Sequence, residues 1–247
     1  SARGRARRNP INCDFPPLRV KFAAPPPAGS LFKKQGALKL VTHCRKTASF
    51  QQFYLLEYSA YRMLNVLAPA SFRTRLANVR YVDSESGKLV VARSGFFLED
   101  TGDLADRVGL QEVKIAKAAF SQHDPAAAAR AVLFLHMIGN HDWSMIAAAT
   151  GEDCCHNGKL LGASKAAAAG FVYVPYDFDY SGFVDTPYAD PPAVIKIPNV
   201  RKRYYRGQCA HNAQVAEQAA IFRARKGELY AAVTSTPGLA GNTKKKA

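Results

Sequence analysis

The sequence predicts an α+β fold with two lobes, in which a small antiparallel sheet with one helix precedes a mainly helical part. Residues that alternate between apolar and polar, as in half-buried strands, recur in the first hundred positions. Apolar residues at three- and four-residue steps predict one helix among these strands. The length of 247 residues allows one large domain or two packed lobes. The expected strands span residues 18–22, 37–44, 73–82 and 88–97, and the helix spans residues 49–67.

The first lobe is expected to cover residues 13–98. After the first strand, the stretch AAPPPAGS forces a turn, because successive prolines fix φ and lack a backbone donor. Ser49 is a candidate N-cap for the helix, and Pro69 lies shortly beyond its end. The turn-forming cluster DSESG then joins the last two strands into a predicted hairpin.

The second lobe is expected to cover residues 99–236. Its most strongly predicted element is an alanine-rich helix over residues 125–138, which Asp124 can cap and which is apolar on nearly all sides. Such a helix belongs in a core. The other expected elements are a helix over residues 103–120 interrupted near Gly109, strands at 159–161 and 171–176, and an amphipathic helix over 211–233.

The formal net charge of +15 favours anionic partners, but much of it lies in a basic arm (1–12) and a basic tail (237–247). We expect both ends to be solvated. Nucleic acid is not expected as the main partner, because no helix-turn-helix, RNA-binding aromatic signature or zinc-finger spacing accompanies the charge. No apolar run reaches the ~18–20 residues of a membrane-spanning helix. Since the chain begins with Ser, we expect residues before it in the natural protein, and export or a cytoplasmic location both stay open.

The cysteines are odd in number and irregularly spaced, so they cannot all pair within one chain. A Cys13–Cys44 disulfide is one expectation for an exported protein. A structural zinc site is an alternative, although the chain has no CxxC pair and adjacent cysteines chelate one tetrahedral ion poorly. Buried or disulfide-bonded cysteines are the simpler interpretation. The candidate zinc ligands are Cys154, Cys155, His156, Cys209 and His211.

The stretch from Gly139 to Gly182 gathers oxygen-bearing side chains that favour hard cations. Asp142 follows the alanine-rich helix, and Asp177 follows the last predicted strand. Carboxylate and amide oxygens bind Mg²⁺ or Mn²⁺, which phosphoryl-transfer enzymes use to neutralise phosphate charge. The candidate metal ligands are Asn157, Asp177 and Asp179.

One interpretation of this stretch is a binuclear metallophosphoesterase. The tetrad Gly139-Asn140-His141-Asp142 and the sequence GDLAD at 102–106 both resemble motifs of that class, in which two metals activate water. However, the tetrad follows a helix instead of a strand, and neither an upstream DxH nor a downstream GHxH completes a second metal site. We therefore keep this function as the third alternative.

The order of the motifs supports another interpretation. LKLVTHC, LLEY, GNHDWS and YDFDYSG follow one another in the order of the working parts of protein kinases. Over roughly residues 13–209 the chain resembles the protein-kinase-like superfamily, and specifically its divergent branch with the HipA and CotH kinases. On these motifs and CDFPPL, the chain also resembles a bacterial family within that branch. The resemblance implies a two-lobed kinase-like fold, with a small antiparallel sheet and one helix in the N-lobe and a mainly helical C-lobe.

The resemblance also implies a role for each candidate residue. Lys39 would contact nucleotide phosphates and pair with Glu57 of the helix, while Asp142 would orient the acceptor hydroxyl. The segment Phe97, Leu98 and Glu99 would form the hinge that meets adenine. Asn157 and Asp177 would hold the metals, with Asp179 as a further ligand.

Two features depart from this pattern. Ordinary kinases place the metal-binding Asn five residues after the catalytic Asp, whereas Asp142 and Asn157 are fifteen residues apart here. No GxGxxG loop covers the phosphates. The sequence thus predicts an atypical phosphotransferase that uses ATP and Mg²⁺ or Mn²⁺ on an acceptor hydroxyl of a protein or small molecule. A non-catalytic pseudokinase that binds a nucleotide or a partner is the alternative.

Overall fold

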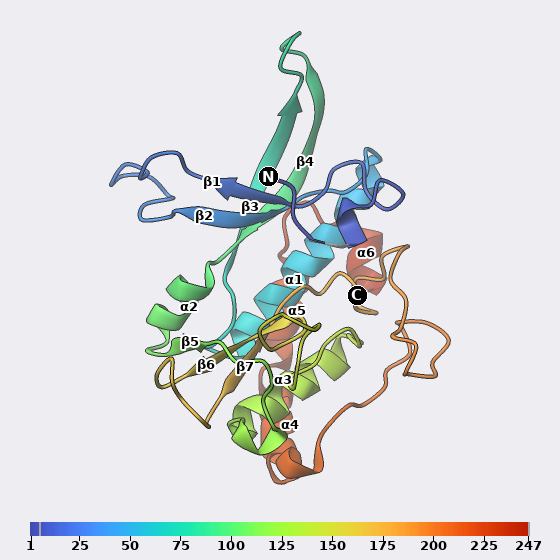
Figure 1. Ribbon diagram of the computed structural model, residues 1–247. Helices are drawn as coiled ribbons and strands as arrows, with labels where there is room; N and C mark the ends of the chain where they lie inside the picture. The colour runs from blue at the N-terminus through green and yellow to red at the C-terminus, as the bar shows by residue number, and fades with distance from the viewer. Residues whose placement is uncertain (5, 247) are drawn as a thin grey trace.

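Four strands from the first hundred residues form one antiparallel sheet, in the order β1-β2-β4-β3. They appear in a computed structural model that describes residues 1–4 and 6–246 (Figure 1). All four strands and the hairpin were predicted from alternation and turn residues, and all are confirmed. Their bounds are β1 Leu18–Lys21, β2 Ala37–Val41, β3 Thr74–Val82 and β4 Leu89–Leu98.

One face of this sheet packs against helix α1, Gln51–Leu67. On that face Lys39 of β2 lies opposite Leu98 of β4. Phe96, two residues before Leu98, brings its ring within 5.7 Å of the Tyr61 ring of α1, measured between centroids. The expected N-cap is wrong: Ser49 lies inside the short 3₁₀-helix η2 (Ala48–Phe50), and no side chain caps α1.

A second, three-stranded antiparallel sheet has the order β5-β6-β7. Its first strand falls where the sequence predicted a helix over 103–120. That prediction is wrong beyond Arg107, because Gly109 adopts a positive φ of 69° that ends α2. The bounds are α2 Thr101–Arg107, β5 Gln111–Val113, β6 Gly158–Gly162 and β7 Val172–Pro175.

Helix α3, Pro125–Met137, runs through the core as predicted. The Asp124 carboxylate caps it by accepting a 2.7 Å hydrogen bond from the Ala127 amide. The predicted helix over 211–233 is divided at Arg225, whose φ of −94° and ψ of 10° are not helical. The remaining elements are η1 Ala6–Arg8, η3 Phe120–Gln122, η4 Cys209–His211, α4 Asn212–Ala224, α5 Lys226–Thr234 and α6 Gly241–Lys246.

The protein is therefore a mixed α and β protein with small antiparallel sheets and several helices, which confirms the α+β class in that general sense. Figure 1 shows α1 below the four-stranded sheet, with α3, α4 and α5 farther from it and the β3–β4 hairpin projecting away. Within the described residues, no helix has the length and apolar character needed to cross a membrane.

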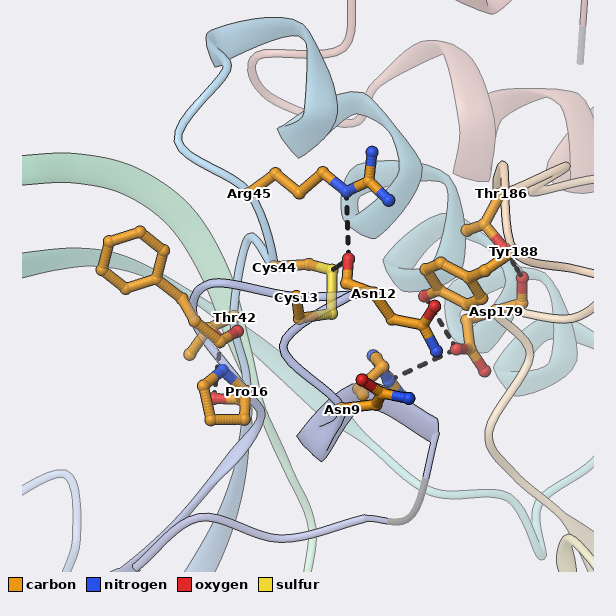
Figure 2. Close-up of a disulfide and its surroundings, with 12 residues drawn as sticks. Asn9, Asn12, Cys13, Pro16, Thr42, Cys44, Arg45, Asp179, Thr186 and Tyr188 are labelled. Atoms are coloured by element: carbon orange, nitrogen blue, oxygen red, sulfur yellow. Dashed lines mark hydrogen bonds and ion pairs between the residues drawn. A yellow bond between two sulfur atoms is a disulfide. The ribbon is translucent and has the colours of Figure 1, made fainter.

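The basic arm differs from the expected solvated tail. Residues 1–3 run along β1, with hydrogen bonds from the Arg3 amide to the Pro17 carbonyl and from the Arg19 amide to the Ser1 carbonyl. Arg7, farther along the arm, has only 5% of its surface exposed. Figure 2 shows how the arm continues into Cys13, which is joined to Cys44 by a disulfide.

Two disulfides pair four of the five cysteines. Cys13–Cys44 was an open expectation and is confirmed, and Cys154–Cys155 is a bond between neighbours. Cys209 is free and exposed. Among the described residues, the cysteines and histidines proposed for zinc do not come together as a ligand group. The simpler interpretation of disulfide-bonded cysteines is confirmed for the four paired residues and is wrong for Cys209.

Removing the Cys13–Cys44 disulfide should lower the free energy of unfolding by about 2–4 kcal/mol, because the bond closes a loop of the unfolded chain. The two cysteines are 31 positions apart. The double variant Cys13→Ala/Cys44→Ala removes both partners of the bond, so that neither is left as a new free thiol, and urea denaturation measures the change. Cys209→Ala is the matched control, expected to change little. An equal loss in both variants would contradict a stabilising role for the bond.

Candidate functional site

A cavity of about 780 Å³ lies among the arm, the loop after α3 and the segment after β7. Its wall contains all four oxygen-bearing residues that the sequence singled out between Gly139 and Gly182. Residues far apart in the chain thus converge on one place, as the motif order predicted. These residues are Asp142, Asn157, Asp177 and Asp179.

Two glycines hold the loops of this site together. The Gly182 amide donates a 2.9 Å hydrogen bond to the Gly139 carbonyl, which ties the loop after α3 to the loop after β7. Gly139 has a φ of 64°, a conformation that other residues rarely adopt. A Cβ atom on Gly182 would lie 2.3 Å from the Val200 carbonyl oxygen. Both positions therefore require glycine for the loops to meet.

Asp142 is held from two sides. The His156 Nε2 atom lies 2.7 Å from its Oδ1 atom, and the Asn157 side-chain amide donates to its Oδ2 atom at 2.9 Å. The hydrogen bond to Asp142 raises the pKa of His156 above its ordinary value. Asn157 also donates to the Asp142 backbone carbonyl at 2.7 Å. The fifteen-residue spacing thus still brings Asn157 to Asp142.

Asp177 has a positive φ of 64°, which Asp and Asn tolerate better than most residues. Its backbone amide donates a 2.8 Å hydrogen bond to the Tyr61 hydroxyl of α1. The next residue, Phe178, packs its ring 4.6 Å from the Tyr61 ring. Helix α1 therefore fixes where the Asp177 carboxylate lies.

Three carboxylates, those of Glu57, Asp177 and Asp179, each have an oxygen within 4.8 Å of the others. We call this group the acidic triad. Glu57 is fully buried and Asp179 is 4% exposed. Burial raises the pKa of Glu57 to about 8 and that of Asp179 to about 6, because a buried carboxylate is costly to ionise. The Tyr188 hydroxyl donates to Asp179 at 2.9 Å.

The guanidinium of Arg7 lies among the three carboxylates. Its Nη2 atom is 2.7 Å from Asp177 Oδ1, its Nε atom is 3.3 Å from Asp179 Oδ2, and its Nη1 atom is 3.5 Å from Glu57 Oε2. Within residues 1–4 and 6–246, Lys39 and Glu57 do not form an ion pair. The expected Lys39–Glu57 pair is therefore replaced by Arg7–Glu57, since the arm brings a guanidinium deeper than Lys39 reaches.

Lys39 lies beside the triad instead. Its ammonium is 4.5 Å from the centre of the Tyr176 ring, in a cation–π contact. Burial lowers its pKa to about 8, and the nearby positive charges of Arg3 and Lys159 act in the same direction, against an opposing effect of Asp177. The lysine is thus a weakly solvated cation next to Asp177.

The expected hinge residues lie at a different cavity. Phe97, Leu98 and Glu99 line a hollow of about 590 Å³ that contains none of the four oxygen-bearing residues. Glu99 pairs with Arg107 at 2.8 Å, and the Phe97 ring packs 5.2 Å from Phe32. The structure therefore does not bring these three residues into the cavity of Asp142 and Asp177.

The parts of the phosphoesterase motif lie apart. Asp103 of the GDLAD sequence is on α2 and lines the smaller cavity, whereas Asp142 lines the larger one. His141 is buried, with its Nε2 atom 2.8 Å from the Lys202 carbonyl oxygen. Among the described residues, these side chains do not form a second group of metal ligands.

Sequence reasoning missed three residues of this site. In the sequence Arg7 is one of several arginines in a charge run, and only its contacts with the acidic triad distinguish it from its neighbours. His156 was considered for zinc and instead contacts Asp142. Tyr61 was one of several aromatic residues of a helix pattern. The only available signal was local: His156 directly precedes Asn157.

No protein-family model, curated protein or solved structure matches this chain. The family resemblance therefore stays a prediction, and the site rests on its own geometry. Carboxylate oxygens suit hard divalent cations. Both Glu57 side-chain oxygens are buried without a hydrogen-bond partner. The residues present thus fit a divalent cation, because its binding would satisfy an orphaned buried carboxylate.

Proposed function

We propose that the protein is a kinase-like phosphotransferase that uses a nucleoside triphosphate and Mg²⁺ or Mn²⁺. The observation that carries this proposal is the convergence of Asp142, Asn157, Asp177 and Asp179 on one cavity. The strand order adds support, because Lys39 lies on an inner strand of the sheet beside α1, which carries Glu57. A kinase needs a lysine, a helix carboxylate and metal-binding oxygens around one cleft.

In this function Asp142 orients the acceptor hydroxyl and accepts its proton. Its carboxylate is held by His156 and Asn157, which leaves it little freedom to rotate away. The acidic triad would hold the divalent cation, which supplies positive charge to the phosphates when it is bound. Lys39 contributes a further positive charge beside Asp177. The cavity volume of about 780 Å³ is within the ~300–1,000 Å³ typical of ligand sites.

The test is ATP consumption by the purified protein with and without Mn²⁺. We expect consumption that requires the metal and that Asp142→Ala abolishes, because the acceptor then lacks its proton acceptor. Asp153→Ala is the control, since Asp153 is an exposed carboxylate of the same cavity wall. Equal activity in the two variants would contradict the role of Asp142.

A non-catalytic nucleotide-binding protein is the second candidate, and one observation favours it. Arg7 occupies the acidic triad, so that Glu57 is not paired with Lys39. If the wild-type protein and Asp142→Ala are equally inactive while ATP still raises the melting temperature, this second function replaces the first. No thermal shift and no turnover would reject both.

A further inference from the structure

The contact of Arg7 with Asp177 of the acidic triad joins residues that are 170 positions apart in the chain. The guanidinium supplies one positive charge to three carboxylates. In the described state it therefore occupies the position that a bound cation would take. Its neighbour Arg8 is exposed, although it belongs to the same arm. The burial of Arg7 is thus specific to that residue and not a general property of the charge run.

The fit of Arg7 in the triad is incomplete. Its Nη1 atom and both Glu57 carboxylate oxygens are buried without a hydrogen-bond partner, and the 3.5 Å between Nη1 and Oε2 is too long for one. Unpaired buried polar groups cost free energy. The state with Arg7 in place therefore leaves the deepest carboxylate of the site unsatisfied.

A divalent cation would suit the same three oxygens. Ligand oxygens lie about 2.0–2.6 Å from such ions, so two oxygens on opposite sides of one ion are about 4–5 Å apart. The triad oxygens all lie within 4.8 Å of one another. The ion would carry two positive charges and would contact Glu57 directly. The guanidinium and the ion cannot occupy this space together.

The arm has the anchors that a reversible movement needs. Residues 1–3 are bound along β1, and Cys13 is fixed by its disulfide to Cys44 (Figure 2). Between these anchors Gly4 has a φ of 82°, and a Cβ there would meet nothing within 4 Å. A local change between the anchors can withdraw Arg7 without unfolding either end. A side chain withdrawn in this way would remain tethered between the two anchors.

We propose that the Arg7 guanidinium is a built-in competitor for a divalent-cation site formed by Glu57, Asp177 and Asp179, so that metal binding and arm docking exclude each other. The cation releases the arm, and the docked arm weakens cation binding by the same factor. The inference rests on the proposed function for its metal and adds self-regulation of that site. Its tests need no ATP, so failure of catalysis and failure of exchange are distinguishable.

The first test measures Mn²⁺ affinity from the paramagnetic resonance signal of free Mn²⁺. If the undocked state is populated at about 0.1–10%, Arg7→Gln should raise the affinity by about 10- to 1,000-fold. Arg8→Gln removes the same charge from an exposed neighbour and should change the affinity little. Adding Glu57→Gln to Arg7→Gln should reverse the gain, whereas adding Asp153→Asn should not.

The second test is made first on the wild-type chain, where the result does not depend on how well a variant folds. Hydrogen exchange of the segment 6–12, followed by mass spectrometry, should accelerate when Mn²⁺ is added. The Asp179→Asn variant should lose this response. The proposal is overturned if Arg7→Gln and Arg8→Gln bind Mn²⁺ with equal affinity, or if Mn²⁺ binds the wild type and leaves exchange of the arm unchanged.

Discussion

Asp177→Asn is expected to lower metal-dependent ATP consumption by about 10²–10³-fold, the range for losing one electrostatic contact to a transition state. The substitution keeps the shape of the side chain and removes its charge. Asn tolerates the positive φ of 64° at this position, and the hydrogen bond from the residue 177 amide to Tyr61 does not involve the side chain. The backbone of the site should therefore remain in place.

We expect so large an effect because Asp177 interacts with two groups of the site. It belongs to the acidic triad, and its charge acts on the neighbouring Lys39. If the proposed function holds, neutralising it removes a metal ligand and one of the negative charges that act on Lys39. ATP turnover and metal-dependent ATP binding, measured by calorimetry, should both be lost.

The matched control is Asp185→Asn. Asp185 also has a positive φ, of 56°, and lies in the loop that follows Asp179. Its side chain is exposed, and its Oδ2 atom lies 3.7 Å from the Arg201 Nη1 atom in a surface ion pair. We expect it to retain turnover and nucleotide binding. Unchanged nucleotide binding in Asp177→Asn would remove Asp177 from the site and leave its ion pair with Arg7 as a structural contact.

The sequence predicted those parts of the fold that depend on local patterns. The alternation in residues 88–97 exists because one side of β4 packs on α1, so the pattern of apolar residues marks the strand. The break at Gly109 was visible as a glycine, but the short strand β5 after it was not. Three residues carry too little periodicity, and β5 exists only because β6 offers it hydrogen bonds.

The order of the motifs predicted only that part of the candidate site that the motifs themselves contain. Asp142, Asn157 and Asp177 were grouped from their sequence, and they do line one cavity. The contact of Arg7 with Glu57 could not be predicted, because nothing in a run of arginines distinguishes the one that will be buried. The hinge residues were assigned by resemblance alone, and their cavity is determined by the packing of Phe32 and Arg107.

Arg7→Met is expected to lower the free energy of unfolding by about 3–5 kcal/mol at pH 8.5 without divalent cations. The reason is that the substitution leaves buried carboxylates without their positively charged partner. Met fills a similar volume but supplies no charge. Burial already raises the pKa of Glu57 to about 8 and that of Asp179 to about 6, while Arg7 opposes both increases. Without Arg7 both pKa values should rise further.

The sign of the pH dependence follows from these shifts. An acid whose pKa is raised in the folded state binds more protons folded than unfolded between the two values. For Glu57 this range runs from about 4.5 to about 8, and for Asp179 from about 3.8 to about 6. The contribution of each carboxyl group to the free energy of unfolding is complete below its unfolded-state pKa. That contribution is lost as the pH rises through its folded-state pKa. Asp177, Tyr188 and Tyr61 also face the site, but the tyrosines stay neutral here because burial raises the pKa of both.

The deficit of Arg7→Met relative to the wild type should therefore widen from pH 4.5 to pH 8.5. Urea denaturation in the presence of a chelator measures it at both values. Arg8→Met controls for the loss of one arm charge and should stay within about 0.5 kcal/mol of the wild type, as exposed substitutions do. A deficit of equal size at both pH values would mean that Arg7 stabilises the fold by packing alone. A widening deficit that Glu57→Gln reduces would identify the buried carboxylate as its cause.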